Sequence, residues 1–509
     1  MRGTKRALVA LAAACAVAAP ASASAAEPPP GDIKNMEFIT NLPEGRQATA
    51  INFLTYGNGA KAMPVMLITG RFGLKTYDFT NPEKPVLLDE LGNDELLLQY
   101  DIDLGRLPTG NRTFWQNEDM DVDQKRKLAF LSRDPRAFGG STSSNNDIAG
   151  VYIVDAKNPR DLKLITFQQL PTGHTTSCVN DCEWLWTGGP ASSNSQRDDL
   201  GWVGGRPIIV TDLRDPANPV AYPNNPVDLF RQDGVTAYAH DVDVDRDGVA
   251  WVSGLGGMRG YWTDGMHKDP LTGKVRRATP LDPVPYAGGG LADDAVSAGN
   301  PGGWMHNGVR PTASELNAKG FKPGSLVMGT EEWFNSSLCN GEGQFVISSL
   351  EGSYNGEGWK STPQNPFRLK TVGTWSPFEK EATVPANSCS AHYFDLADGL
   401  IAYGWYAQGT RILDVTDPTE PTQVAYFRPN GGNVWASYWW GDYVIVADNA
   451  RGIDILKYEG PKPGRGNGKK KEVVAPKMNA AQQQFAAQVA RSMAADPVLG
   501  FACPLPIYE

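Results

Sequence analysis

The sequence predicts an all-β protein, a seven-bladed β-propeller with a short C-terminal helical tail. The first observation is composition, because 55 Gly, 38 Pro, 14 Trp and 17 Tyr among 509 residues are typical of a turn-rich β chain. The second is a strand-turn-strand unit that recurs along residues 46–458. The third is the alternation of apolar and polar residues within each unit, a period that belongs to strands and not to helices.

The clearest part of the unit is a strand that ends in Asp, two further residues, Asp or Asn, and then Pro. The Asp or Asn side chain can bond its own backbone and Pro cannot extend a central strand, so this step predicts a turn. Apolar residues then resume, and each copy therefore predicts a β-hairpin. The copies are LKTYDFTNPEKPVLL from Leu74, VYIVDAKNPRDLKLI from Val151, IIVTDLRDPANPVAY from Ile208 and RILDVTDPTEPTQVAYF from Arg411.

A second strand-turn-strand element precedes these hairpins and completes seven units within a propeller domain of residues 27–458. Each unit is longer than the ~40–45 residues of a minimal blade, and the excess falls in Gly/Pro-rich insertions that we expect to be loops. Radial closure would protect the strand edges, whereas an open stack or two sandwiches are the alternatives. The units span 46–88, 114–167, 174–223, 238–285, 304–374, 390–427 and 433–458.

The first 26 residues predict a signal peptide. Arg2, Lys5 and Arg6 precede an apolar run from Ala7 to Ala19, and the small residues ASASAA follow. No other stretch of the sequence reaches the ~18 apolar residues of a membrane span, so we expect a bacterial protein that is secreted in soluble form. The protected edges of a closed propeller suit a monomer. The net charge of −10 argues against a nucleic-acid partner.

After the last unit the character of the chain changes. Residues 459–477 form a basic, Pro/Gly-rich linker without an apolar face. Residues 478–509 begin with an apolar stripe at helical spacing, which predicts a small helix docked on the propeller. A tether to a partner or to the cell wall through Lys469–Lys471 is the alternative. The stripe consists of Met478, Phe485, Val489 and Met493.

Five cysteines follow the predicted signal peptide. Disulfides are the usual state of cysteine in an exported protein, and an odd number leaves at least one thiol free or paired between chains. We expect one local bridge, Cys178–Cys182, and one bridge between neighbouring units, Cys339–Cys389. Cys503 is then left over.

Two local motifs offer other readings of these segments. His174, Asp181 and the two nearest cysteines could form a small zinc site, although an oxidising compartment favours the disulfide. The segment DVDRDG from Asp243 to Gly248 matches the first half of an oxygen-rich calcium loop. Position twelve of such a loop would be Gly254 instead of Glu, so we expect a strand followed by a hairpin turn.

Four of the five histidines occupy one position in consecutive units, at intervals of 66, 66 and 86 residues. The innermost strand of each propeller blade lines the central channel, so we expect the four imidazoles to converge there. Neutral imidazole suits copper, iron or zinc, and such a set can hold a transition metal with a position open for substrate. The four are His174, His240, His306 and His392, whereas His267 falls outside the register in what we expect to be an exposed loop.

Carboxylates complete the predicted centre. Glu118 takes the same position one unit earlier and is predicted to be a fifth ligand or a catalytic proton acceptor. Metal-binding histidines donate their second ring N–H to an outer acceptor. Candidate acceptors are Asp119, Asp241, Glu331 and Glu332. The alternative is that the histidines are polar plugs of the channel, bonded to backbone or water.

The repeated hairpin motif resembles the bacterial LVIVD-repeat proteins over most of residues 46–458. This resemblance implies a secreted or surface-associated propeller and implies no particular chemistry. More distantly, the YIVD…P pattern is similar to the family of selenium-binding proteins and methanethiol oxidases, propellers that include copper enzymes. No residue role carries over from either family.

Two functions are compatible with these patterns. The first is a metal-dependent oxidoreductase that acts on a small or apolar molecule admitted through the channel mouth. The second is an extracellular scaffold whose rim loops recognise a carbohydrate, a peptide or a surface partner. Propellers host both kinds of function. The scaffold hypothesis depends on aromatic residues expected on the surface, namely Trp304, Trp333, Trp359, Trp375, Trp439 and Trp440.

Overall fold

A computed structural model provides the structure of the chain. It describes residues 31–105, 118–134, 148–189, 208–227, 231–232, 235–236, 238–255, 257–269, 272–286, 305–332, 343–350, 369–377, 390–463 and 472–493. The predicted signal peptide, Cys339, Cys389 and Cys503 lie outside these residues.

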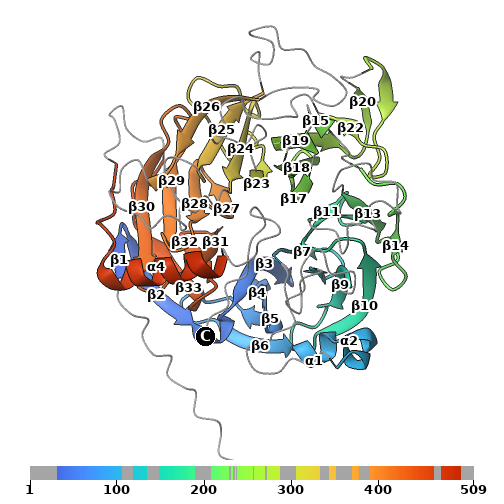
Figure 1. The fold of residues 1–509 in the computed structure, drawn as a ribbon, viewed down its shortest axis with the longest axis horizontal. Helices are drawn as coiled ribbons and strands as arrows, with labels where there is room; N and C mark the ends of the chain where they lie inside the picture. The colour runs from blue at the N-terminus through green and yellow to red at the C-terminus, as the bar shows by residue number, and fades with distance from the viewer. Residues whose placement is uncertain are drawn as a thin grey trace, which may run out of the picture.

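Seven antiparallel sheets surround a central axis (Figure 1). In five of them the strands follow sequence order from the axis outward, and in the other two an N-terminal strand is added at the outer edge. The predicted seven-bladed propeller is therefore confirmed. Blade 1 contains β3 (Ala48–Tyr56), β4 (Met63–Gly70), β5 (Gly73–Asp78) and β6 (Val86–Leu91). Blade 2 contains β7 (Met120–Asp123), β8 (Leu128–Arg133), β9 (Ala149–Asp155) and β10 (Lys163–Leu170). Blade 3 contains β11 (Thr175–Val179), β12 (Trp184–Gly188), β13 (Ile209–Asp212) and β14 (Val220–Ala221).

The next two blades have the same plan with longer insertions. Blade 4 contains β17 (Tyr238–Val244), β18 (Val249–Leu255), β19 (Gly257–Trp262) and β22 (Val284–Pro285). Blade 5 contains β23 (Met305–Val309), β24 (Leu326–Glu331), β25 (Phe345–Ser349) and β26 (Lys370–Trp375). Two small hairpins accompany blade 4, namely β15 (Arg231–Gln232) with β16 (Val235–Thr236) and β20 (Met266–Lys268) with β21 (Val275–Arg277).

The N-terminal strands complete the last two blades and close the ring. Blade 6 contains β27 (Phe394–Ala397), β28 (Leu400–Gly404), β29 (Thr410–Asp414) and β30 (Thr422–Pro429), with β1 (Gly31–Lys34) outermost. Blade 7 contains β31 (Val434–Trp440), β32 (Tyr443–Asp448) and β33 (Gly452–Tyr458), with β2 (Met36–Leu42) outermost. Met36 thus pairs with Tyr458 across the whole propeller sequence. The first predicted repeat unit begins at residue 46, so these two closing strands lie outside the predicted units.

The core consists of apolar side chains packed between neighbouring sheets. Leu67 of blade 1 and Val154 of blade 2 are fully buried in one cluster, which the short helix α1 (Asn93–Leu96) covers through Leu96. The adjacent helix α2 (Gln99–Asp103) brings Asp101 onto the buried guanidinium of Arg133, with two bonds of 2.7 Å. Two 3-10 turns, η1 (Pro43–Gly45) and η2 (Gly59–Lys61), complete the short elements.

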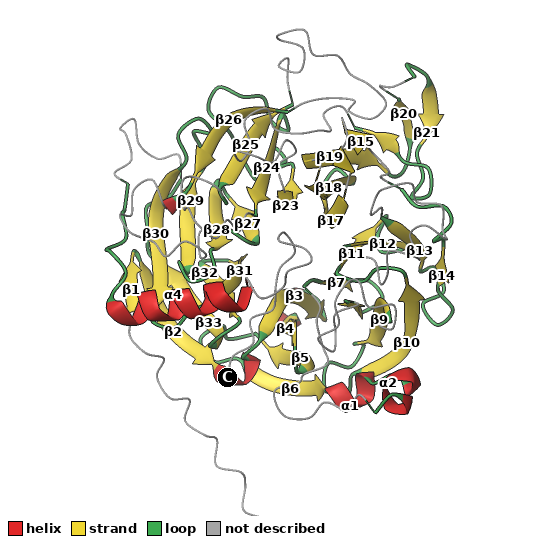
Figure 2. Cartoon of the chain, viewed as in Figure 1, coloured by secondary structure: helices red, strands yellow, loops and turns green. Residues whose placement is uncertain are grey.

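The predicted docking helix is α4 (Ala480–Met493), which Figure 2 shows lying across blades 6 and 7. Asn479 and Gln482 cap its start reciprocally, since each side chain accepts a bond from the main-chain N–H of the other. Met478, Phe485 and Val489 of the apolar stripe pack on the propeller, and Val489 is fully buried. Among the described residues, no helix has the length and apolar character required to cross a bilayer.

The Asp-rich segment forms a strand and a turn, as expected. Asp245 Oδ1 accepts the main-chain N–H groups of Asp247 and Val249, both at 3.0 Å. Its other oxygen accepts from Arg310 Nε at 2.8 Å. The two main-chain bonds close the β17–β18 hairpin, and Arg310 pairs with the Asp245 carboxylate from the next blade.

Candidate metal centre

Irregular strand pairing at the start of two inner strands changes the direction in which the histidine side chains project. In β17 the register passes from Ala239 directly to Asp241, so His240 is the extra residue of a β-bulge. In β23 the register is likewise broken around His306. His174 and His392 stand just before β11 and β27. The sequence thus places all four at the inner start of a blade.

An aspartate three residues after the site position connects the inner strand of one blade to the inner strand of the next. Asp121, three residues after Glu118, accepts the main-chain N–H of Cys178 in the next blade at 2.6 Å. Asp243 and Asp395, at the same spacing from His240 and His392, accept main-chain N–H groups of Gly308 at 3.2 Å and Trp439 at 2.8 Å. These bonds tie inner strands of successive blades together, which holds the site residues in register.

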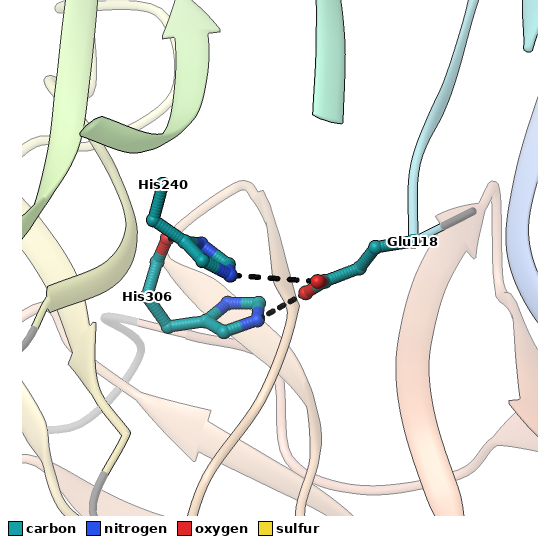
Figure 3. A group of neighbouring side chains, drawn as sticks. All are labelled: Glu118, His240 and His306. Carbon is teal, nitrogen blue, oxygen red and sulfur yellow. Dashed lines mark hydrogen bonds and ion pairs between the residues drawn. The ribbon is translucent and has the colours of Figure 1, made fainter. Parts of the chain in front are cut away.

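The four imidazoles and Glu118 converge in the interior, as the repeat alignment predicts. None of the five side chains is more than 1 % exposed. Ring centroids of successive histidines are 4.9, 4.5 and 4.0 Å apart in chain order. Figure 3 shows two of the rings pointing at the Glu118 carboxylate. The five are Glu118, His174, His240, His306 and His392.

The Glu118 carboxylate lies between two pairs of imidazoles. Its Oε2 contacts His174 Nε2 and is 3.4 Å from His240 Nε2. Its Oε1 contacts His306 Nε2 and is 3.2 Å from His392 Nε2. Within the first pair, the two Nε2 atoms are 3.1 Å apart. The four Nε2 atoms therefore surround one carboxylate.

Outer acceptors orient three of the rings. His174 Nδ1 lies 2.7 Å from Asp134 Oδ2, just beyond β8. His240 Nδ1 lies 2.9 Å from the His306 carbonyl, and His392 Nδ1 lies 2.8 Å from the Trp435 carbonyl. An Nδ1–H that donates outward leaves the Nε2 lone pair directed at the centre. Sequence reasoning did not identify Asp134, although an Asp directly after the second strand of a blade was visible.

The other predicted carboxylates occupy different places. Glu332 is fully buried, with Oε2 3.9 Å from His306 Nε2, and its Oε1 accepts from Tyr406 Oη at 2.6 Å. Glu331 is also buried, and its main-chain N–H donates to the Gln344 carbonyl. Asp119 directly follows Glu118 in the sequence, and Asp241 directly follows His240. The Oδ1 atom of Asp241 accepts a hydrogen bond from the main-chain N–H of Val242 at 2.8 Å. Of these four carboxylates, Glu332 is the one that lies close enough to His306 and His392 to bind the same ion with them.

Burial and neighbouring charged groups shift the pKa values of the centre's side chains in different directions. Burial alone would raise the pKa of Glu118, but electrostatic interaction with the imidazoles of His174, His240 and His306 outweighs burial and holds the pKa well below its ordinary value. Burial lowers the pKa of His174, yet Glu118 and Asp134 raise it to about 9. Burial and the neighbouring His392 hold the pKa of His306 well below its ordinary value. His306 is therefore neutral near pH 7, as a metal ligand must be.

No family model and no curated protein sequence match this chain. Similar solved structures include the WD40 repeats of RRP9 and the structure of U3-55K. Each is 9 % identical with a TM-score of 0.44, and each comparison covers 85 % of this chain and 99 % of the other. The assignment of seven blades depends on the strand pairing of this chain itself.

The structure separates the local alternatives from the centre. Cys178 and Cys182 form a disulfide across the β11–β12 turn, while His174 faces Glu118 instead of these sulfurs. The geometry therefore favours the disulfide over the small zinc site. His267 lies apart from the other histidines, in the β20–β21 hairpin, with its ring stacked on Trp262 at a centroid distance of 4.2 Å.

The aromatic residues expected on the surface are only partly there. Trp375 is 4 % exposed and packs on Trp405 with ring centroids 5.2 Å apart, so its expected exposure is wrong. It is buried because it forms part of the core between blades 5 and 6. Trp439 and Trp440 are half-buried. Trp304, Trp333 and Trp359 lie outside the described residues.

Proposed function

We propose that this protein is a metal-dependent oxidoreductase, with a transition metal held by His174, His240, His306, His392 and Glu118. The observation that carries the proposal is the convergence of four Nε2 atoms on one buried carboxylate. Metal–nitrogen bonds of about 2.0–2.1 Å separate two ligand atoms of one ion by roughly 3 Å. The 3.1 Å between the Nε2 atoms of His174 and His240 agrees with that spacing.

The donor set suits copper, iron or zinc, and a change of oxidation state at the metal itself requires one of the first two. A bound ion would supply a Lewis acid or a site for O2. The chain's own residues would hold protons around it. His174 can keep its Nδ1 proton on Asp134 while its Nε2 faces the ion. Where Glu118 is not bound to the ion, its carboxylate would instead accept a proton from a substrate. Burial of the whole set would exclude bulk water.

The setting of this activity is also part of the proposal. The pattern of the first 26 residues supports export, and a closed ring of blades with protected strand edges suits a monomer. The substrate would be a small or apolar molecule that can enter the channel mouth. The scaffold function stays the alternative, and it differs in one respect: histidine substitutions would leave partner binding unchanged.

Elemental analysis of protein purified without chelator tests the metal. We expect at least about one transition-metal ion per chain, and loss of at least about 10-fold in affinity for His240→Ala, which removes a central ligand. His267→Ala is the matched control, because it removes a histidine that stacks on Trp262 away from the centre. Absence of stoichiometric metal, both as purified and after reconstitution with Cu²⁺, Fe²⁺ and Zn²⁺, would overturn the proposal.

A further inference from the structure

We infer that the centre is built for two metal ions, with Glu118 bridging them through its two oxygens. This inference depends on the proposed metal site and adds the number of ions and the residues of each position. The first position would use His174 and His240 with Glu118 Oε2. The second would use His306 and His392 with Glu118 Oε1, and would add Glu332.

The contacts of Glu118 divide the four histidines into these pairs. Each carboxylate oxygen has its own two nearest Nε2 atoms, Oε2 toward His174 and His240 and Oε1 toward His306 and His392. A single ion bound by all four Nε2 atoms would need to lie about 2.0–2.1 Å from each of them. The Glu118 carboxylate occupies the space between the pairs, so one ion on each oxygen fits the arrangement better than one ion in the middle.

The second pair has a further carboxylate. The ligand atoms of His306, Glu332 and His392 all lie within 4.8 Å of one another, and so do those of Glu118, His240 and His306. Because the group of Glu118, His240 and His306 takes one histidine from each pair, the two positions are adjacent, as in two-metal sites whose ions are about 3.5–4 Å apart. Tyr406 Oη holds Glu332 in place with a bond of 2.6 Å.

The buried charge favours two cations over one. Glu118 and Glu332 are fully buried beside four imidazoles, and Asp134 adds a third buried carboxylate against His174. Buried charges persist only when they are paired or bind metals. When all four imidazoles are neutral, as metal ligands must be, three carboxylates offset three of the four positive charges of two divalent ions, whereas one divalent ion would leave one net negative charge inside the propeller. The expected ligand of such a pair is a substrate oxygen clamped by both ions.

Titration of metal-free full-length protein with Co²⁺ alone tests the inference. We expect absorbance changes to saturate at about two equivalents, with elemental analysis after gel filtration giving the same ratio. Glu332→Gln should retain about one equivalent, because it removes a ligand of the second position only. Glu331→Gln is the control, since the neighbouring Glu331 belongs to neither ligand group found among the described residues. Circular dichroism should show that both variants are folded.

The outcomes separate this inference from the proposed function. Saturation of the wild-type protein at one equivalent would overturn the two-ion centre and leave a single-metal site. Two equivalents retained by folded Glu332→Gln would overturn the assignment of Glu332 to the second position. Binding of no Co²⁺, together with no stoichiometric metal in the purified protein, would overturn the proposed function itself.

Discussion

At the scale of single residues, the centre depends on which proton each imidazole keeps. His174 lies between Glu118 on one side and Asp134 on the other, and these two carboxylates raise its pKa to about 9 against the effect of burial. A protonated His174 cannot bind metal until its Nε2 proton leaves. Asp134 is therefore a positioning residue: it holds the Nδ1 proton and leaves Nε2 to face the centre.

Asp134→Asn removes this charge and keeps the side-chain shape. We expect the pKa of His174 in the metal-free protein to fall, because one of the charges that raise it is gone. Metal affinity should fall by about 10- to 100-fold, the usual cost of losing an outer partner of a ligating histidine. Histidine NMR titration and competition with a chelator measure the two effects. Asp155→Asn, at a partly exposed ion pair with Lys157, is the control; unchanged titration of His174 would contradict the role of Asp134.

The sequence predicted the members of the centre that share a repeat position and missed those that do not. Glu118 and the four histidines align because each begins the inner strand of its blade. Asp134 and Tyr406 reach the centre from other points of the blades, the end of β8 and the turn before β29. Their roles depend on tertiary contacts with no periodic signal. Trp435, whose carbonyl orients His392, stands at the equivalent position of the seventh unit and could have been found there.

At the scale of elements, α4 supports the wall of the centre. Phe485 and Val489 pack on Tyr406 and Trp435, and these two residues in turn hold Glu332 and His392. Tyr406 has a φ of +39°, a left-handed conformation that is unfavourable for a residue with a large side chain. Packing of the helix compensates for such strain by holding the turn from outside. The helix is thus connected to the second metal position through one layer of side chains.

Val489→Asp tests this connection. An unpaired carboxylate at this fully buried site costs several kcal/mol, enough to undock the helix. We expect a lower Tm, faster proteolysis within α4 and weaker binding of the second Co²⁺ equivalent than of the first. Gln488→Asp adds the same charge at the neighbouring exposed position and should leave all three measurements unchanged. Equal binding of both equivalents by an undocked Val489→Asp protein would show that α4 does not support the centre.

At the scale of the whole molecule, the ring closes where β2 pairs with β33. The seven units were predictable because hairpin turns recur along the chain, whereas β2 carries no repeat motif and its partner lies more than 400 positions away. Asn41 of β2 pairs with Asp454 of β33 and donates to its Oδ1 at 2.9 Å. The seam between the two ends of the propeller therefore contains a buried carboxylate, next to Arg451 and Asp448.

This carboxylate makes the stability of the closed ring depend on pH. Burial raises the pKa of Asp454 to about 7, Asp448 adds to the shift and Arg451 opposes it. A carboxyl group with a raised pKa in the folded state stabilises the fold at low pH, and this contribution is lost as pH rises from about 4 through about 7. Asp454→Asn, which stays neutral, should lose less stability than the wild-type protein over this range.

Urea unfolding of both proteins at several pH values between about 5 and 8 measures the difference. Other buried carboxylates of raised pKa, including Asp121 and Asp395, are present in both proteins, so their contributions cancel in the comparison. We expect the free energy of unfolding of the wild-type protein to approach or fall below that of the variant as pH increases. Parallel pH profiles would mean that Asp454 is already ionised in the folded protein, with Arg451 as the dominant influence on its charge.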